Sequence, residues 1–251
     1  MAAEMRLQAG GEGEPVLLLV HGLGATGDVW NRWPPLLAER WPGRWLAPDL
    51  PGHGGSDALP GYSFGALAAA LAGIVDGPER LVVLGHSLGG VLGLTLASGW
   101  FGVHVESVVG LGIKVAWTAD ELDKAGALAL RPVSWYASRE AAAARYLRVS
   151  GLDGLLGADD DAVGAGVREE AGQWRLAMDP SVFSVGAPDM RGLVCAARST
   201  VVLARGEHDP MVTDDQLAMS GSTRVTLPGL GHNAHVENPA ATMALLEPYL
   251  R

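Results

Sequence analysis

The sequence predicts an α/β fold, with one mostly parallel, doubly wound sheet and helices on both of its faces. Two observations predict it. Short, almost wholly apolar runs recur along the chain, and segments of helical composition alternate with them. Apolar runs without polar alternation are typical of strands that are covered on both faces. Their alternation with helices indicates βαβ units, in which neighbouring strands run parallel.

Each element follows from this pattern in chain order. The expected strands cover residues 16–20, 81–84, 105–111, 200–204 and 224–227. The expected helices cover residues 30–40, 63–76, 90–100, 214–220 and 239–250. These elements make up a core domain of residues 1–113 and 190–251.

The alternation stops between residues 114 and 189. This stretch contains no convincing strand, and its alanine-rich composition favours helix, most clearly at residues 141–144. We therefore expect residues 114–189 to form a helical cap that is inserted into the core domain.

Composition narrows the class of protein. Of the 251 residues, 48% are apolar and 18% are charged, so the chain can bury a large core, which fits a globular enzyme and argues against a tail or linker protein. The formal charge of −10 and the absence of a basic cluster argue against nucleic acid and anionic membranes as partners. No apolar run reaches the ~18 residues of a membrane span, and the first residues lack a secretory pattern, so we expect a cytoplasmic protein.

The cysteine content gives no indication of a bound metal. The single cysteine, Cys195, has no Cys or His neighbours at metal-ligand spacing, and we expect it to be a buried structural thiol. We expect neither a metal nor an organic cofactor.

The strongest local motif is the pentapeptide from Gly85 to Gly89, which has the G-x-S-x-G pattern of a nucleophile elbow around Ser87. With 35 glycines in the chain, about 0.25 such matches are expected by chance, so the motif alone is weak. Its context is specific, because it directly follows an apolar strand and directly precedes a helix. A sharp turn of this kind exposes the serine hydroxyl at a helix N-terminus, where negative charge is stabilised.

A serine hydroxyl needs a base within hydrogen-bond reach, and the base needs an orienting acid. His232 follows the last expected strand and precedes the last helix, which favours it over His235 as the base. Asp209 follows the strand at 200–204 and is the favoured acid, with Glu207 as a weaker candidate. Asp214 and Asp215 are expected to cap the next helix instead. The order Ser, Asp, His is typical of one hydrolase fold.

Acyl transfer also needs two backbone N–H donors for the developing oxyanion. Leu88, directly after the serine, is one candidate. Leu23, in the His21-Gly-Leu-Gly24 segment after the first apolar strand, is the other. His21 itself is expected to fix this loop by a hydrogen bond.

Five motifs in order and spacing resemble the α/β-hydrolase superfamily, in particular its serine esterases and lipases with a helical cap. They are HGLG at 21–24, DLPGHGGSD at 49–57, GHSLGG at 85–90, GEHDP at 206–210 and GHNAHVENP at 231–239.

This resemblance implies several further features. The first strands would form a hairpin, and His53 and Asp57 would stabilise the fold. A cap domain would cover the site. Serine at the elbow, in place of the aspartate of haloalkane dehalogenases and epoxide hydrolases, argues against those two chemistries.

The cap contains a large share of the aromatic residues, and substrate pockets are mostly apolar. We expect some of them to line the pocket, with the following as candidates: Trp117, Trp135, Tyr136 and Trp174. The alternative is that most of them pack inside the cap itself.

Together these patterns predict a serine hydrolase that cleaves a carboxylic ester of a small, largely hydrophobic substrate. The same residues would also suit a lactonase, a thioesterase, a C–C bond hydrolase, an acyltransferase or a cofactor-free peroxidase, because the fold does not decide between them. A receptor that keeps the triad and uses its cap as a ligand-gated surface is a further alternative. Rapid multiple turnover would favour the enzyme over the receptor.

Overall fold

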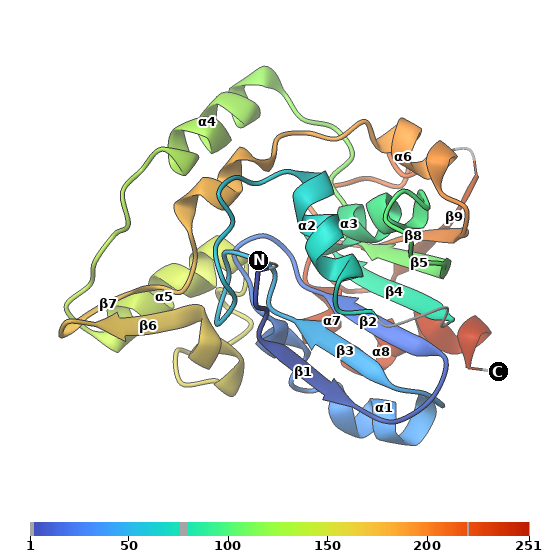
Figure 1. Cartoon of the computed structure of the whole chain (residues 1–251), viewed down its shortest axis with the longest axis horizontal. Helices are drawn as coiled ribbons and strands as arrows, with labels where there is room; N and C mark the ends of the chain where they lie inside the picture. Colours follow the sequence, from blue (N-terminus) through green and yellow to red (C-terminus); the bar gives the residue numbers. More distant parts are fainter. Residues whose placement is uncertain (1–2, 76–79, 220, 251) are drawn as a thin grey trace.

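The computed structural model describes residues 3–75, 80–219 and 221–250, and its centre is a seven-stranded sheet with the order β1-β3-β2-β4-β5-β8-β9 (Figure 1). Every neighbouring pair is parallel except β1 and β3. The prediction of an α/β fold with a mostly parallel sheet is confirmed. The strands are β1 (Leu7–Gly10), β2 (Val16–Val20), β3 (Trp45–Pro48), β4 (Leu81–His86), β5 (Val105–Leu111), β8 (Thr200–Gly206) and β9 (Ser222–Leu227).

Helices cover both faces of the sheet because the strands are apolar on both faces. In β2, Leu17 and Leu19 belong to one core cluster, whereas Val16, Leu18 and Val20 belong to the other. One face is covered by α2 (Phe64–Ala72), α3 (Leu88–Ala97) and α6 (Met190–Ala196). The opposite face is covered by η1 (Gly27–Trp30), α1 (Pro34–Arg40), α7 (Ala234–Glu237), α8 (Pro239–Met243) and η4 (Ala244–Tyr249).

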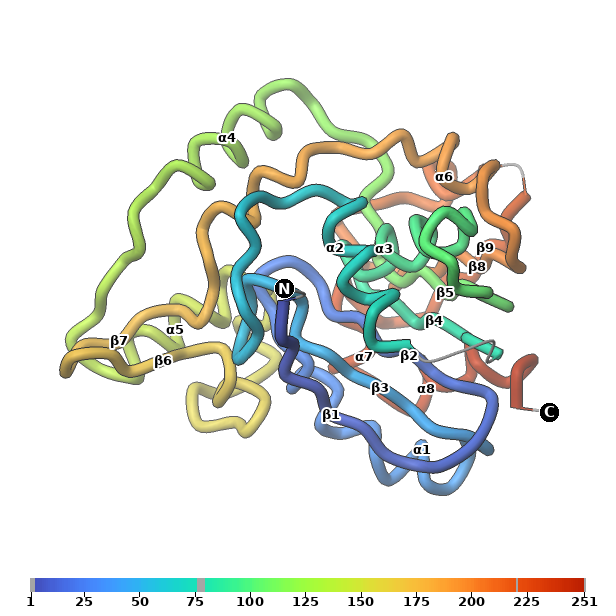
Figure 2. The backbone as a smooth tube through the Cα atoms, viewed as in Figure 1, coloured from blue at the N-terminus to red at the C-terminus, as the bar shows by residue number. Residues whose placement is uncertain are grey.

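Between β5 and α6 the chain leaves the sheet, forms a separate group of elements beside it and returns (Figure 2). This group includes a two-stranded antiparallel hairpin, which corrects the expectation that residues 114–189 contain no strand. Its turn, at Ala171 and Gly172, has positive φ at both residues, as the tight hairpin turns do. The elements are α4 (Ala119–Ala129), α5 (Arg139–Ser150), η2 (Asp161–Gly166), β6 (Val167–Glu170), β7 (Gln173–Leu176) and η3 (Pro180–Val185).

Other expectations for the core also need correction. The first strands do not form a hairpin with each other, because β1 pairs with β3 and not with β2. The expected helix at 214–220 is a turn over its described residues, and the expected helix at 239–250 divides into α8 and η4, with Pro248 inside η4. Residues 76 and 220, the last positions of two expected helices, lie outside the described residues. Cys195 is exposed, whereas we expected a buried thiol.

Within the described ranges, none of the helices combines the length and the apolar character that a membrane crossing requires.

Candidate active site

Ser87 lies in the sharp turn between β4 and α3. Its backbone has φ 49° and ψ −115°, a strained conformation for a residue with a side chain. A Cβ atom at Gly85 would lie 2.3 Å from the backbone of Gly89, and one at Gly89 would lie 2.2 Å from the carbonyl oxygen of Val20. Strand and helix are therefore so close that only glycine fits on either side of the serine, as a nucleophile elbow requires.

Asp209 and His232 meet at the same edge of the sheet. Asp209 follows β8, His232 follows β9, and the carboxyl ends of these parallel strands lie side by side. Nδ1 of His232 is 3.1 and 3.0 Å from the two carboxylate oxygens of Asp209. The Asp209 side chain is completely buried and also accepts a hydrogen bond from the Met211 N–H, which fixes its orientation. The pair has the geometry of an orienting acid and its histidine.

Ser87 lies at this edge as well. Its N–H donates to the carbonyl of Leu111 at the end of β5, and a Cβ at the next residue, Gly112, would lie 3.1 Å from Nδ1 of His232. In the part of the chain that the structure describes, no hydrogen bond joins Ser87 Oγ to His232. Such contacts are often long in the absence of substrate and tighten in the reacting complex.

His86 contacts His232, and His235 packs against His86, an arrangement that the sequence analysis did not predict. Nε2 of His86 lies 3.1 Å from the carbonyl oxygen of His232, and the His86 ring packs 4.3 Å from that of His235. His235, the rival candidate base, is buried against the ring of Trp30 and has no hydrogen-bond partner at Nδ1 among the described residues. Burial lowers the pKa of His235 to about 3 and that of His86 well below its usual value, so both rings are neutral.

The loop that contains Leu23 is fixed by two buried histidines. Nε2 of His21 accepts a hydrogen bond from the N–H of Leu50 at 2.8 Å, and Nε2 of His53 accepts one from the N–H of Gly24 at 3.2 Å. These contacts agree with structural roles for both histidines. A Cβ at Gly22 would lie 3.3 Å from Cβ of Ser87, so the loop passes directly over the elbow.

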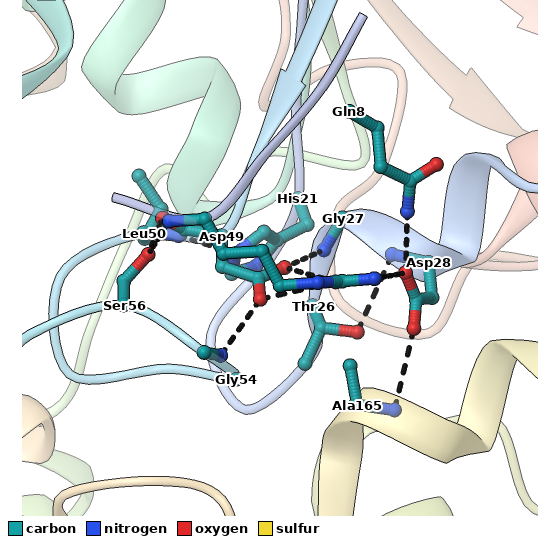
Figure 3. A network of polar contacts seen from close by, with 12 residues as sticks. Gln8, His21, Thr26, Gly27, Asp28, Asp49, Leu50, Gly54, Ser56 and Ala165 are labelled. Carbon is teal, nitrogen blue, oxygen red and sulfur yellow. Dashed lines mark hydrogen bonds and ion pairs between the residues drawn. The ribbon is translucent and has the colours of Figure 1, made fainter. Parts of the chain in front are cut away.

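A polar network anchors the far end of the same loop (Figure 3). Arg6 bridges two buried carboxylates, at 2.8 Å from Asp28 and 3.2 Å from Asp49. Asp49 also accepts from the N–H of Gly27, and Asp28 accepts from the N–H of Ala165 in η2. The network thus connects the segment before β1, the loop after β2 and the inserted segment.

The other acidic candidates serve the structure around the site. Glu207 accepts a hydrogen bond from the N–H of Gly229, and Asp57 accepts one from the N–H of Glu4. Asp214 pairs with Arg205 at 3.0 Å and does not begin a helix.

A cavity of about 410 Å³ opens beside Ser87, and we call it the nucleophile cavity. Most of its wall is apolar, and Trp117 is part of it, as are both candidate oxyanion donors, Leu23 and Leu88. The charged side chains in its wall, Lys114 and Glu121, were not predicted. The position of Lys114 three residues beyond β5 could have indicated it, whereas nothing in the sequence places Glu121 near the elbow. The lining residues are Leu23, Phe64, Ser87, Leu88, Val91, Lys114, Trp117, Glu121, Leu122, Ala125, Gly126, Phe183, Ser184, Val185, Gly186 and Met211.

Three aromatic residues that were expected at the pocket lie away from the nucleophile cavity. Tyr136 and Trp174 pair their backbones in a short antiparallel bridge and pack on the core cluster that includes α5, so they serve the inserted segment's own packing. Tyr136 also lines a separate, smaller cavity of about 90 Å³. Trp135 is 44% exposed, and the guanidinium of Arg175 lies over its ring.

Comparison with known proteins identifies the family of the chain. The model of the alpha/beta hydrolase family matches residues 17–245. A 2-succinyl-6-hydroxy-2,4-cyclohexadiene-1-carboxylate synthase of Serratia proteamaculans (strain 568) is 29% identical over 272 aligned positions, which cover 100% of this chain and 98% of that protein.

Solved structures give the same fold. The thioesterase domain from the curacin biosynthetic pathway is similar with a TM-score of 0.77 and 22% identity, covering 99% of this chain and 100% of that one. An E-2-(acetamidomethylene)succinate hydrolase is similar with a TM-score of 0.76 and 24% identity, and the match covers 98% of this chain and 95% of that one. The expectation that the chain resembles this superfamily is confirmed.

Proposed function

Because the chain belongs to the alpha/beta hydrolase family, we propose that it is a serine hydrolase that cleaves a carboxylic ester, or a related acyl bond, of a small and largely hydrophobic substrate. One observation carries the proposal. The hydrogen-bonded pair of Asp209 and His232 lies at the sheet edge where the elbow presents Ser87 to an apolar cavity.

In the proposed reaction, Ser87 Oγ attacks the carbonyl carbon of the ester while Nε2 of His232 takes the hydroxyl proton. Asp209 accepts the Nδ1–H bond of the histidine, which fixes its tautomer and stabilises the imidazolium. The imidazolium then passes the proton to the leaving alcohol, and an acyl group remains on Ser87. Water, deprotonated by His232, attacks this acyl group and releases the carboxylic acid, so one water is consumed for each ester cleaved.

The backbone N–H groups of Leu23 and Leu88 are the proposed oxyanion donors. Leu88 is the first residue of α3, so its N–H has no acceptor within the helix. The fixed loop around Leu23 faces the same cavity. Donors that are held in place before the reaction stabilise the developing charge without reorganisation.

The nucleophile cavity favours an apolar acyl or alcohol group. Its volume of about 410 Å³ falls in the usual range for small-molecule sites, and the side chains of Phe64, Trp117 and Phe183 contribute to its wall.

The experiment is labelling with a fluorophosphonate probe, followed by identification of the modified peptide. We expect the label on Ser87, and we expect Ser87→Ala to lose labelling and to lower kcat for p-nitrophenyl esters by at least about 10⁴-fold with an unchanged thermal unfolding curve. Ser134→Ala is the control, because Ser134 is exposed and lies outside the nucleophile cavity. Normal turnover by Ser87→Ala would falsify the proposal.

A second candidate is favoured by the full-length match to the Serratia synthase, whose name describes the formation of a cyclic carboxylate. In that case the same site would form such a product without an acyl intermediate. Mass spectrometry after rapid quenching separates the two, since only the hydrolase accumulates a substrate-derived acyl group on Ser87.

A further inference from the structure

The nucleophile cavity has one cation in its wall among the residues that the structure describes. Lys114 lies three residues beyond the end of β5, and its side chain is only 19% exposed. The other charged lining residue is Glu121 on α4, whose side chain is 43% exposed. A lysine side chain that is four-fifths covered favours an anionic or hydrogen-bonding partner for its ammonium, because an unpaired charge with little access to water is costly.

Lys114 and Glu121 form an ion pair, but the two side chains do not depend on each other equally. Glu121 has other donors, because its Oε2 accepts from the N–H of Thr118 at 2.9 Å and from the hydroxyl of Thr118 at 3.2 Å, in the capping box that begins α4. Lys114 has three N–H donors, and within the described part of the chain its ammonium is hydrogen-bonded to Glu121 alone. Two of its donors are therefore left for another acceptor.

The helix that carries Glu121 is weakly held. None of the residues of α4 is buried, and its main packing partner is η3, which is also part of the inserted segment. A small shift of α4 buries or exposes little apolar surface, so it costs little free energy. Glu121 can therefore move away from Lys114 and stay satisfied by its capping box.

We infer that Lys114 binds a free carboxylate of the substrate, which takes the ammonium over from Glu121 while Ser87 attacks an ester or related acyl group elsewhere in the same molecule. The inference rests on the proposed function and names its substrate class. The substrate has an apolar body that fits the leucine, phenylalanine and tryptophan side chains of the nucleophile cavity, with a carboxylate at one end.

The test compares matched esters. Mono-p-nitrophenyl esters of a series of straight-chain dicarboxylic acids are paired with p-nitrophenyl esters of monocarboxylic acids of equal carbon number. For the chain length that spans Ser87 and Lys114, we expect kcat/KM of the acidic ester to exceed that of its neutral partner by about 10- to 100-fold, which is typical of a charge-assisted hydrogen bond. Lys114→Met, which keeps the length of the side chain, should reduce this ratio to about one or below.

Two further variants sharpen the result. Glu121→Gln removes the competing carboxylate, so the KM of the acidic ester should fall several-fold and the ratio should rise. Lys124→Met is the matched control for Lys114→Met. Lys124 lies on α4, the helix that carries Glu121, is 72% exposed and pairs with Asp120 away from the nucleophile cavity. Its ratio should equal that of the unchanged protein, whereas an equal fall in both lysine variants would indicate general electrostatics and overturn the inference.

Binding is also measured without turnover. The free dicarboxylic acid of the best length should raise the Tm of the unchanged protein and of Ser87→Ala, but not the Tm of Lys114→Met. A probe-labelled enzyme that hydrolyses both esters of a pair equally well overturns the Lys114 inference and leaves the serine hydrolase intact. Absence of Ser87 labelling together with a Lys114-dependent Tm shift overturns the proposed function and supports the carboxylate site.

Discussion

At the scale of single residues, His232 is held from two directions. Asp209 contacts Nδ1 of its ring, and Nε2 of His86 contacts its main-chain carbonyl oxygen. The two contacts have different functions, since the first selects the tautomer that leaves Nε2 as acceptor, whereas the second fixes the backbone of the loop after β9.

Replacement of the orienting acid tests the first contact. In Asp209→Asn the amide keeps an oxygen for the Met211 N–H, so we expect nearly unchanged stability, but the histidine is no longer held in the reactive tautomer. We expect kcat to fall by about 10³- to 10⁴-fold, measured with the best ester of the series above. Glu207→Gln is the control, because this neighbouring acid is exposed and its carboxylate accepts a hydrogen bond from the N–H of Gly229, away from His232. A loss of less than 10-fold in Asp209→Asn would rule out the assigned role.

Ser87, Asp209 and His232 could be predicted from the sequence because each lies in the segment that follows an expected strand, and parallel strands bring their carboxyl ends to one edge. The same reasoning could have found Lys114, which lies three residues beyond β5, but not its partner Glu121, which belongs to the inserted segment. It also misplaced Trp135 and Trp174, because aromatic composition does not tell which face of a segment turns toward a cavity.

At the scale of elements, the strand-turn-helix unit around Ser87 depends on close backbone contact between β2, β4 and α3. We expect Gly89→Ala to lower the free energy of unfolding by about 3 kcal/mol, because its Cβ would lie 2.2 Å from the carbonyl oxygen of Val20 and the backbone would have to move. Gly126→Ala is the matched control within α4, where a Cβ meets no atom within 4 Å. It should raise stability by up to about 1 kcal/mol. Urea unfolding of both variants measures the difference, and equal midpoints would contradict the steric argument.

Strands could be predicted where the chain has a short run of mostly apolar residues. The strands β2, β4, β5 and β8 are mostly apolar and mostly buried, and all four were predicted. The hairpin of β6 and β7 has no such run, because most of its side chains are exposed or half-buried. After β8, Thr213 and Gln216 exchange the hydrogen bonds of a capping box, which favours a helix start. Only a turn follows, because β9 begins at Ser222, directly after Gly221 with its φ of +88°.

At the scale of the whole molecule, four buried histidines come together from distant parts of the chain beside the candidate active site. They are His21, His53, His86 and His235, and burial lowers the pKa of each. Each is therefore neutral in the folded protein. Their placement links the geometry of the candidate site to stability in acid, because protonation of these buried rings would place unsolvated positive charges in the interior that orders the loops at the site.

This arrangement predicts that the protein loses stability in mild acid. The folded-state pKa of His53 and of His235 is about 3, whereas in the unfolded chain a histidine titrates near its ordinary value of 6.5. Above that value neither state binds the proton. As the pH falls from 6.5 toward 3, the unfolded state binds protons that the folded state does not, so the free energy of unfolding decreases by about 1 kcal/mol per pH unit for each such histidine.

His235→Phe removes the contribution of one of these histidines to the pH dependence. Phenylalanine preserves the packing against the Trp30 ring and removes the Nδ1 atom that has no partner among the described residues. Between pH 6 and pH 4 the plot of unfolding free energy against pH, from urea titrations at each pH, should become shallower by about 1 kcal/mol per unit. His104→Gln, at an exposed position, should leave the slope unchanged. An unchanged slope in His235→Phe would mean that His235 is protonated in the folded state, and the neutral histidine cluster behind His232 would have to be abandoned.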